Sequence, residues 1–242
     1  MYKRQYWGYA LRIGIPIVPH YLSGIILNQG DRIMIDKMVG KTEVALYGLA
    51  YSIGMLVQLF ISGMNSALTP WMYSKIKKGD IRSMRKVLQL LSIVVVGIAV
   101  ALMLISPELV LIFGSPKYRE AVYVIPPVAA SVFFIFIYNI LSMPQFYYEK
   151  TQFLMAASMA AAGANVVLNF IFIRLFGYIA AGYTTLACYM LYSVGHYIVS
   201  KRILVNEGIQ ENLMNPGFLV ACSVFLIGAS IICNLIFPYR IL

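Results

Sequence analysis

The stretch GIPIVPHYLSGIILNQGDRIMI, residues 14–35, decides the fold. At a rise of about 1.5 Å per residue, an apolar helix of this length crosses the hydrocarbon core of a bilayer. Pro16 and Pro19 lie near its start, and we expect them to kink the helix or to delay its regular start, because proline removes a backbone donor. A span that served only as an anchor would need no such residues.

The adjacent pair Asp31 and Arg32 lies near the end of this stretch. Charged side chains are costly in lipid, so they should face protein, water or the interface. One interpretation is that the pair lies beyond the hydrocarbon and caps the helix. The other is that it lines a polar cavity where a substrate or a partner helix meets it. Apolar sequence resumes at once in residues 33–35, which favours the cavity.

The composition is that of a polytopic membrane protein. Of 242 residues, 61% are hydrophobic and 12% are charged, and the mean hydropathy is +0.79. Soluble domains are about 45–50% apolar and about 25% charged. The net charge of +10 would suggest nucleic acid in a soluble protein. Here the cations lie beside apolar runs, so we expect membrane lipids and no nucleic acid as partners.

The apolar runs predict an all-α fold, a polytopic transmembrane helix bundle of about seven spans. We expect two parts, a six-span lobe over 1–202 and, over 203–242, an amphipathic segment followed by one further span. Residues 203–216 read as a short surface helix. The seven expected spans are 13–35, 44–72, 87–113, 121–147, 152–173, 178–200 and 217–237.

The basic residues predict the orientation. Residues 75–86 carry six Lys or Arg. If the N-terminus is cytoplasmic, twelve of the nineteen Lys and Arg lie inside, as the positive-inside rule prefers. Seven spans then place the C-terminus outside. These twelve are Lys3, Arg4, Arg12, Lys75, Lys77, Lys78, Arg82, Arg85, Lys86, Lys150, Lys201 and Arg202.

Polar residues within the spans are the candidates for function. Arg32 is the first candidate for contact with a ligand, and Asp31 would hold it in place. His20 could titrate during transport or could be a hydrogen-bonded packing residue. Four amides could bond between helices or bind sugar hydroxyls: Asn65, Asn139, Asn165 and Asn169. The last two lie one helical turn apart on one face.

Metal and cofactor chemistry is not expected. The three cysteines, Cys188, Cys222 and Cys233, lie in apolar runs without metal-ligand spacing. The chain has two histidines, and its nine acids lie mostly in expected loops. We therefore expect no metal site, no cofactor and no catalytic residue.

Several blocks resemble bacterial polysaccharide-biosynthesis flippases, the O-antigen and capsule repeat-unit exporters of the multidrug/oligosaccharidyl-lipid/polysaccharide superfamily. The first blocks are PIVPH at 16–20 and DRIMI at 31–35, followed by ALYGLAYS at 45–52 and ALTPW at 67–71. Later blocks are NVVLNFIFIRLFG at 165–177 and AAGYTT at 180–185. They follow the order expected for the second half of such a protein.

The resemblance implies one of two pseudo-symmetric lobes around a cavity that opens alternately to each side of the cytoplasmic (inner) membrane. It implies that an N-terminal lobe is missing and that the chain is a fragment. The implied substrate is an oligosaccharide on undecaprenyl diphosphate. Arg32, Asp31, His20 and the four asparagines would then contact its head group in a wet cavity.

Three alternatives remain open from the sequence. A cation-coupled drug exporter of the same superfamily would need intramembrane acids, of which the spans hold almost none. A membrane glycosyl-transferring enzyme would need a catalytic acid or base or a large polar loop, and the longest expected loop is about a dozen residues. The chain could also be a non-functional remnant.

Overall fold

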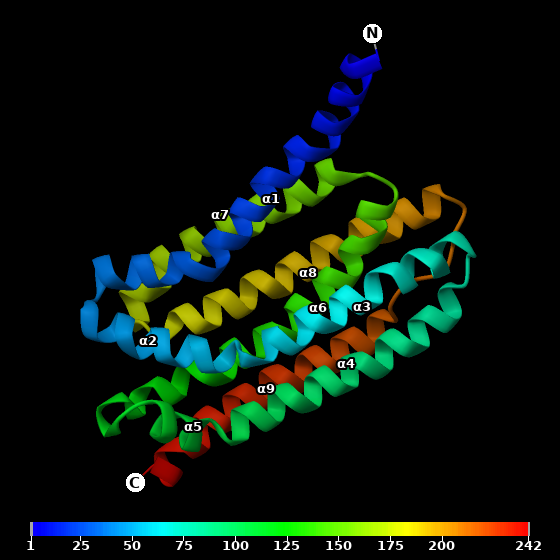
Figure 1. Cartoon of the computed structure of the whole chain (residues 1–242). Helices are drawn as coiled ribbons and strands as arrows, with labels where there is room; N and C mark the ends of the chain where they lie inside the picture. Colours follow the sequence, from blue (N-terminus) through cyan, green and yellow to red (C-terminus); the bar gives the residue numbers. More distant parts are fainter. Residues whose placement is uncertain (1, 242) are drawn as a thin grey trace.

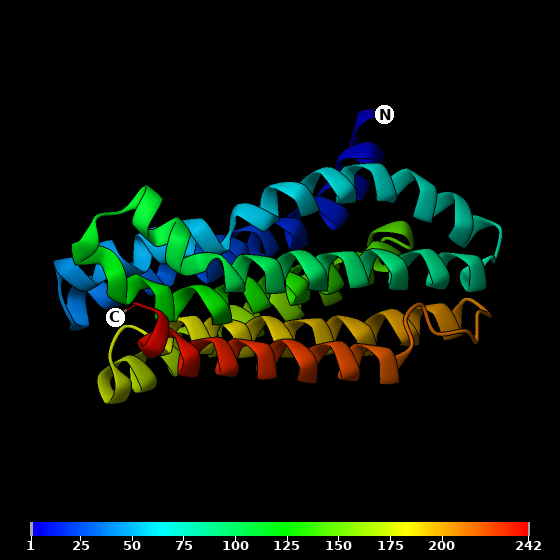
Figure 2. The same cartoon turned by 90° about the horizontal axis from the view of Figure 1, so that it is seen from below.

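The computed structural model describes residues 2–241, and the side chains of residues 6–239, as a bundle of helices without strands (Figure 1). The α-helices are α1 (Tyr2–Met38), α2 (Lys41–Gly54), α3 (Leu56–Lys77), α4 (Ile81–Leu104), α5 (Ser106–Phe113), α6 (Ile125–Tyr147), α7 (Thr151–Phe176), α8 (Ala180–Asn206) and α9 (Pro216–Ile241). A 3-10 helix, η1 (Pro116–Val124), precedes α6. The long helices run along a common axis (Figure 2). The predicted all-α fold is confirmed.

Six segments of the described chain are long and apolar enough to cross a membrane, where seven were expected. The expected sixth span, 178–200, is the one that is not among them, although α8 is long and lies against α6 and α7. Its buried face carries hydroxyls and a histidine, including Thr184, Thr185 and His196. These polar residues lower its hydropathy, and neighbouring helices rather than lipid surround them.

The expected spans 44–72 and 87–113 are each divided into two helices, whereas the expected span 13–35 lies within one continuous helix. The chain bends at Met55, between α2 and α3, and at Ile105, between α4 and α5. Pro107 lies in the first turn of α5, where its missing N–H costs least. Pro16 and Pro19 lie inside α1, which already begins at Tyr2. The expectation of a delayed helix start was therefore wrong.

The expectation of a short surface helix over 203–216 was also wrong. Helix α8 continues to Asn206, and Gly208 then adopts a left-handed φ of +84°. Glycine takes this conformation without steric cost, so the helix ends there. Irregular chain follows as far as α9, and Arg85 of α4 holds it by donating from Nε to the Asn212 carbonyl at 2.7 Å.

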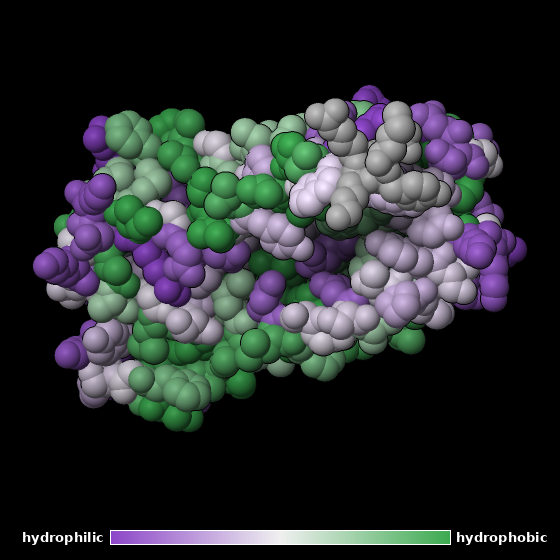
Figure 3. All heavy atoms as spheres, turned by 45° about the horizontal axis from the view of Figure 1, so that its top comes forward, coloured by the Kyte–Doolittle hydropathy of each residue, from purple (hydrophilic) through white to green (hydrophobic). Residues whose placement is uncertain are grey.

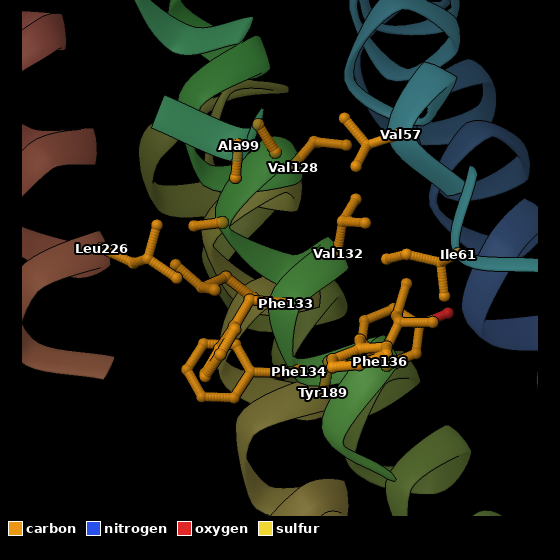
Figure 4. Packing of buried hydrophobic residues seen from close by; sticks show 14 of the residues in the cluster. Val57, Ile61, Ala99, Val128, Val132, Phe133, Phe134, Phe136, Tyr189 and Leu226 are labelled. Atoms are coloured by element: carbon orange, nitrogen blue, oxygen red, sulfur yellow. The ribbon is translucent and has the colours of Figure 1, made fainter. Parts of the chain in front are cut away.

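Helix α6 forms the centre of the molecule. Nearly every one of its residues is buried, and it packs most extensively against α8 and α4. Phe133, Phe136 and Val132 contact residues of the surrounding helices in this core (Figure 4). The outer faces are apolar too: Leu90 and Leu235 are more than 60% exposed. Apolar residues both inside and outside fit a lipid environment.

The connections α3–α4, α6–α7 and α8–α9 lie at the same end of the bundle as the N-terminus (Figure 1). Among the residues with described side chains, the basic residues of these connections and of the adjoining helix ends belong to this end: Lys75, Lys77, Lys78, Arg82, Arg85, Lys86, Lys150, Lys201 and Arg202. Asp80 caps α4 by accepting from the Ser83 N–H, and Lys75 Nζ lies 2.5 Å from its Oδ2. The hydrogen bond from Lys75 is the main reason that the pKa of Asp80 is lowered to about 2. The cytoplasmic location of this end stays a prediction.

Gly54 marks the closest approach of α2 to α6. A Cβ at this position would lie 2.6 Å from Val128 Cγ1, whereas a Cβ at Gly97 of α4 would meet nothing within 4 Å. We predict that Gly54→Ala lowers the free energy of unfolding by about 1–3 kcal/mol through overpacking. Gly97→Ala should leave it unchanged or raise it, because alanine favours helix. Thermal unfolding of both variants in detergent tests this, and equal effects would contradict the close approach.

Candidate functional site

A cavity of 730 Å³ opens between α1, α2, α3, α6 and α8. The face of the molecule seen in Figure 3 is hollowed near its middle, with hydrophilic side chains around the hollow. Polar side chains reach the cavity from three helices: Arg32 and His20 from α1, Gln58 from α3 and Asn139 from α6. Aromatic residues supply much of the remaining wall, namely Tyr21, Tyr51, Tyr138, Phe146, Tyr189 and Tyr192.

Arg32 has spare hydrogen-bonding capacity in this cavity. Its guanidinium carbon lies 5.2 Å from the centroid of the Tyr51 ring, and NH1 lies 3.4 Å from Gln29 Oε1. Its Nε is buried without a hydrogen-bond partner, and so is Oε1 of Gln58. Unpaired buried polar atoms cost free energy. The cavity therefore offers one charged donor and one amide acceptor to a polar ligand.

Asp31, the neighbour of Arg32, lies in a different environment. Its carboxylate is fully buried. Tyr47 Oη and Thr185 Oγ1 each donate to Oδ2 at 2.6 Å, and Asn169 Nδ2 donates to Oδ1 at 2.5 Å. These donors come from α2, α8 and α7. They compensate a carboxylate that has left water, and they join four helices at one point.

The hydrogen bonds continue beyond the carboxylate. Asn169 Nδ2 also donates to Asn165 Oδ1 at 3.2 Å, and Asn165 Nδ2 donates to Thr185 Oγ1 at 3.4 Å. Thr184 Oγ1 donates to Asn169 Oδ1. We call this group the Asp31 cluster: Asp31, Tyr47, Asn165, Asn169, Thr184 and Thr185. Within the part of the chain that the structure describes, no basic side chain forms an ion pair with Asp31.

A layer of tyrosines separates the cavity from the Asp31 cluster. Tyr47 and Tyr51 lie one turn apart on α2, with ring centroids 5.8 Å apart. Tyr47 donates to Asp31, while Tyr51 donates to Asn28 Oδ1 on the cavity wall at 2.8 Å. Successive helical residues point about 100° apart. Asp31 and Arg32 therefore serve two compartments on different sides of α1.

The structure thus divides the seven predicted site residues into three sets. Arg32, His20 and Asn139 line the cavity. Asp31, Asn165 and Asn169 belong to the buried cluster and are fully buried. Asn65 lies in α3 away from both, and its Oδ1 has no hydrogen-bond partner. The expected support of Arg32 by Asp31 is not seen, because the carboxylate accepts from other helices.

Other residues of the site gave little signal in the sequence. Tyr47, Thr184 and Thr185 complete the Asp31 cluster, and Gln58 completes the polar cavity wall. Hydroxyl residues are common wherever membrane helices pack, so they do not stand out. The one available signal was the spacing of Asn165 and Asn169, which placed both on one helix face.

Comparison with known proteins gives a family and two relatives. The MatE family model matches residues 16–171. Over 159 residues the chain is 29% identical to "Lsg locus putative protein 1" of Haemophilus influenzae, a match that covers 62% of this chain and 38% of that protein. It is 30% identical over 159 residues to an "Uncharacterized membrane protein" of the same organism, covering 62% of this chain and 37% of the relative. No solved structure gives a significant match.

Thr185 tests the role of the Asp31 cluster in stability. Thr185→Val keeps the shape of the side chain but removes the donor to a buried carboxylate, so we predict a loss of about 1.5–3 kcal/mol in the free energy of unfolding. Thr69 is the matched control, because its hydroxyl bonds only to the Asn65 carbonyl of its own helix. Thr69→Val should change stability by about 0.5 kcal/mol or less. Equal losses in thermal unfolding would contradict the assignment.

Proposed function

This chain belongs to the MatE family of membrane transporters, and we propose that its cavity carries the head group of a lipid-linked oligosaccharide across the membrane. The observation that carries the proposal is that Arg32 and Gln58 both line the cavity and that each has a buried polar atom without a partner, Nε and Oε1 respectively. A guanidinium donates well to phosphate oxygens, and an amide oxygen accepts from a sugar hydroxyl. A diphosphate joined to a sugar presents both groups side by side.

The tyrosines of the cavity wall support a sugar ligand. The rings of Tyr138 and Tyr189 are nearly parallel, with centroids 6.2 Å apart, and Tyr192 lies 4.5 Å from Tyr138. Each ring offers an apolar face together with a hydroxyl that can donate or accept. A sugar ring likewise has apolar C–H faces and hydroxyl edges. Asn139 adds a further amide from a partly buried position of α6.

An apolar groove supports a lipid on the same substrate. It has a volume of 360 Å³ and lies between α6, α8 and α9, where Phe134, Val194 and Val224 line it. Val194 and Val224 are more than half exposed on the outer surface. The groove and the cavity lie on different faces of the packed helices α6 and α8, so a polyprenyl chain in the groove would have to pass around these helices to reach a head group in the cavity. Alternating access by two lobes would then move the head group across the inner membrane.

The match spans less than two fifths of the length of the curated relatives. We therefore propose that this chain supplies one wall of the transport path and that a second, N-terminal lobe supplies the other. Cell-surface polysaccharide synthesis is the process that such a flippase would serve. Membership in a transporter family favours this over the glycosyl-transferring enzyme considered from the sequence.

Arg32 is the residue to test. We predict that Arg32→Ala weakens binding of undecaprenyl diphosphate by roughly 10- to 100-fold, since a charge-assisted hydrogen bond contributes about 1.5–3 kcal/mol. Arg174→Ala is the matched control, because the Arg174 guanidinium lies 4.0 Å from the Phe170 ring and lines no part of the cavity. The test is to measure the affinity of the wild type and of both variants for undecaprenyl diphosphate in detergent. Equal affinity of wild type and Arg32→Ala would exclude the proposed contact.

The Asp31 cluster favours a second candidate, cation-coupled transport. The sequence argued against it because acids within the spans are scarce, yet Asp31 is fully buried with no ion-pair partner in the described chain. A carboxylate in this position must bind a proton or a cation, or rely on its donors alone. The hydroxyl oxygens of Tyr47 and Thr185 contact it, and the cluster around them holds the oxygens of Thr184, Asn165 and Asn169. Oxygen ligands suit hard cations.

A stability titration separates these possibilities. A ligand that binds only the folded state adds about 2.7 kcal/mol to its stability at 100 times its dissociation constant. We predict that Na⁺, compared with choline, raises the melting temperature of the wild type but not of Asp31→Asn, and that a lower pH raises the melting temperature of the wild type relative to that of Asp31→Asn. Asp36→Asn is the control, because Asp36 is exposed near the end of the same helix. A wild type that responds to neither ion nor pH would count against coupling at Asp31.

A further inference from the structure

The two histidines of the chain meet in one buried cluster, although 176 positions separate them. His20 of α1 and Tyr192 of α8 are joined by a 3.1 Å hydrogen bond between Nδ1 and the phenol oxygen. His196 lies one turn beyond Tyr192, and their rings meet edge to face at 4.5 Å. Tyr138 of α6 lies against both. The proposed transport site uses His20 as a wall residue and leaves His196 without a role.

Gln145 of α6 is the hydrogen-bonding neighbour of the His196 ring. Its amide nitrogen lies 2.7 Å from His196 Nδ1 and donates to the Leu141 carbonyl at 3.3 Å. An amide nitrogen can only donate, so Nδ1 accepts and the neutral ring carries its proton on Nε2. Both residues are fully buried. In this state His196 Nε2, Gln145 Oε1 and Ser200 Oγ are all buried without a partner.

These unpartnered atoms are satisfied differently once the ring is charged. Adding a proton to Nδ1 turns that atom into a donor, which would then face the donating amide nitrogen. If the Gln145 amide turns over, Oε1 accepts from Nδ1–H and gains the partner that it lacks in the neutral state. The turned amide loses the 3.3 Å hydrogen bond from its nitrogen to the Leu141 carbonyl. The amide thus has two orientations, one for His196 Nδ1 without a proton and one for Nδ1 with a proton.

The surroundings of His196 supply no counter-charge. The titratable groups that face it are His20 from α1, Tyr138 from α6 and Tyr192 from α8. In the described chain no Asp or Glu is recorded in contact with the ring. Ser200 lies one turn further along α8, toward the basic end of the bundle where α8 and α6 terminate.

We propose that His196 is a proton-binding site, separate from Asp31, that adjoins the cavity through Tyr192, whose phenol is hydrogen-bonded to His20. The proton passes from water to the Nδ1 lone pair. An N–H bond forms there, the hydrogen bond from the Gln145 amide nitrogen breaks, and no electrons are transferred. A charge on His196 disfavours a second charge on His20, because both rings lie against Tyr192. This proposal goes beyond the proposed function, and it does not depend on the identity of the transported substrate.

Two histidines make the site directly observable. We expect ¹⁵N-histidine NMR of the full chain in micelles to show one ring as the Nε2–H tautomer at neutral pH. Lowering the pH should convert that ring to imidazolium before the protein unfolds, and His20→Gln should make its protonation easier. Gln145→Glu places a carboxylate beside Nδ1 and should raise the proton affinity of His196 at least tenfold. Gln145→Leu cannot accept from Nδ1–H and should lower it at least tenfold.

Gln152→Leu is the matched control, because Gln152 is exposed at the start of α7. This variant should leave the ¹⁵N resonances and the titration of both histidine rings unchanged. The wild-type titration needs no variant, so the test stands even if a Gln145 variant fails to fold. A ring that stays neutral until the protein unfolds would overturn the proposal. An Nδ1–H tautomer at neutral pH, or a titration that Gln145→Glu does not shift, would overturn it too.

Discussion

The burial of the Asp31 carboxylate is the constraint on which the rest of the structure depends. A carboxylate away from water needs donors, and here they come from Tyr47, Asn169 and Thr185 on three different helices. Satisfying one side chain therefore fixes how α1, α2, α7 and α8 are rotated relative to one another. Because apolar side chains face lipid as readily as protein, packing alone specifies these rotations less strongly.

The rotation of α1 then decides where the polar cavity forms. With Asp31 turned into the cluster, Arg32 faces the cavity, and the tyrosines of α2 divide one compartment from the other. The polar residues of the bundle consequently have two kinds of task. Those of the Asp31 cluster satisfy one another, whereas Arg32 and Gln58 keep atoms without partners in the cavity. The second kind costs stability unless a ligand binds, which is why it points to function.

The sequence predicted the helical class, the basic end and most of the apolar spans, because hydropathy and charge are local properties. It also placed Asn165 and Asn169 on one face, since that follows from the helical repeat. It could not predict that Asp31 leaves Arg32 and bonds to Thr185, more than 150 residues away. That depends on how four helices are rotated. The helix expected over 178–200 is present as α8, but the roles of the hydroxyls and the histidine on its buried face depend on the helices beside it and could not be predicted from hydropathy.

The most direct test of the two compartments is the reach of water to neighbouring residues of α1. In a background where Cys188, Cys222 and Cys233 are replaced by alanine, Arg32→Cys and Asp31→Cys are each treated with a charged, membrane-impermeant thiol reagent. The structure predicts fast modification at position 32 and little at position 31, because the first faces the cavity and the second is fully buried. Equal modification at both positions, or faster modification at position 31, would contradict the account.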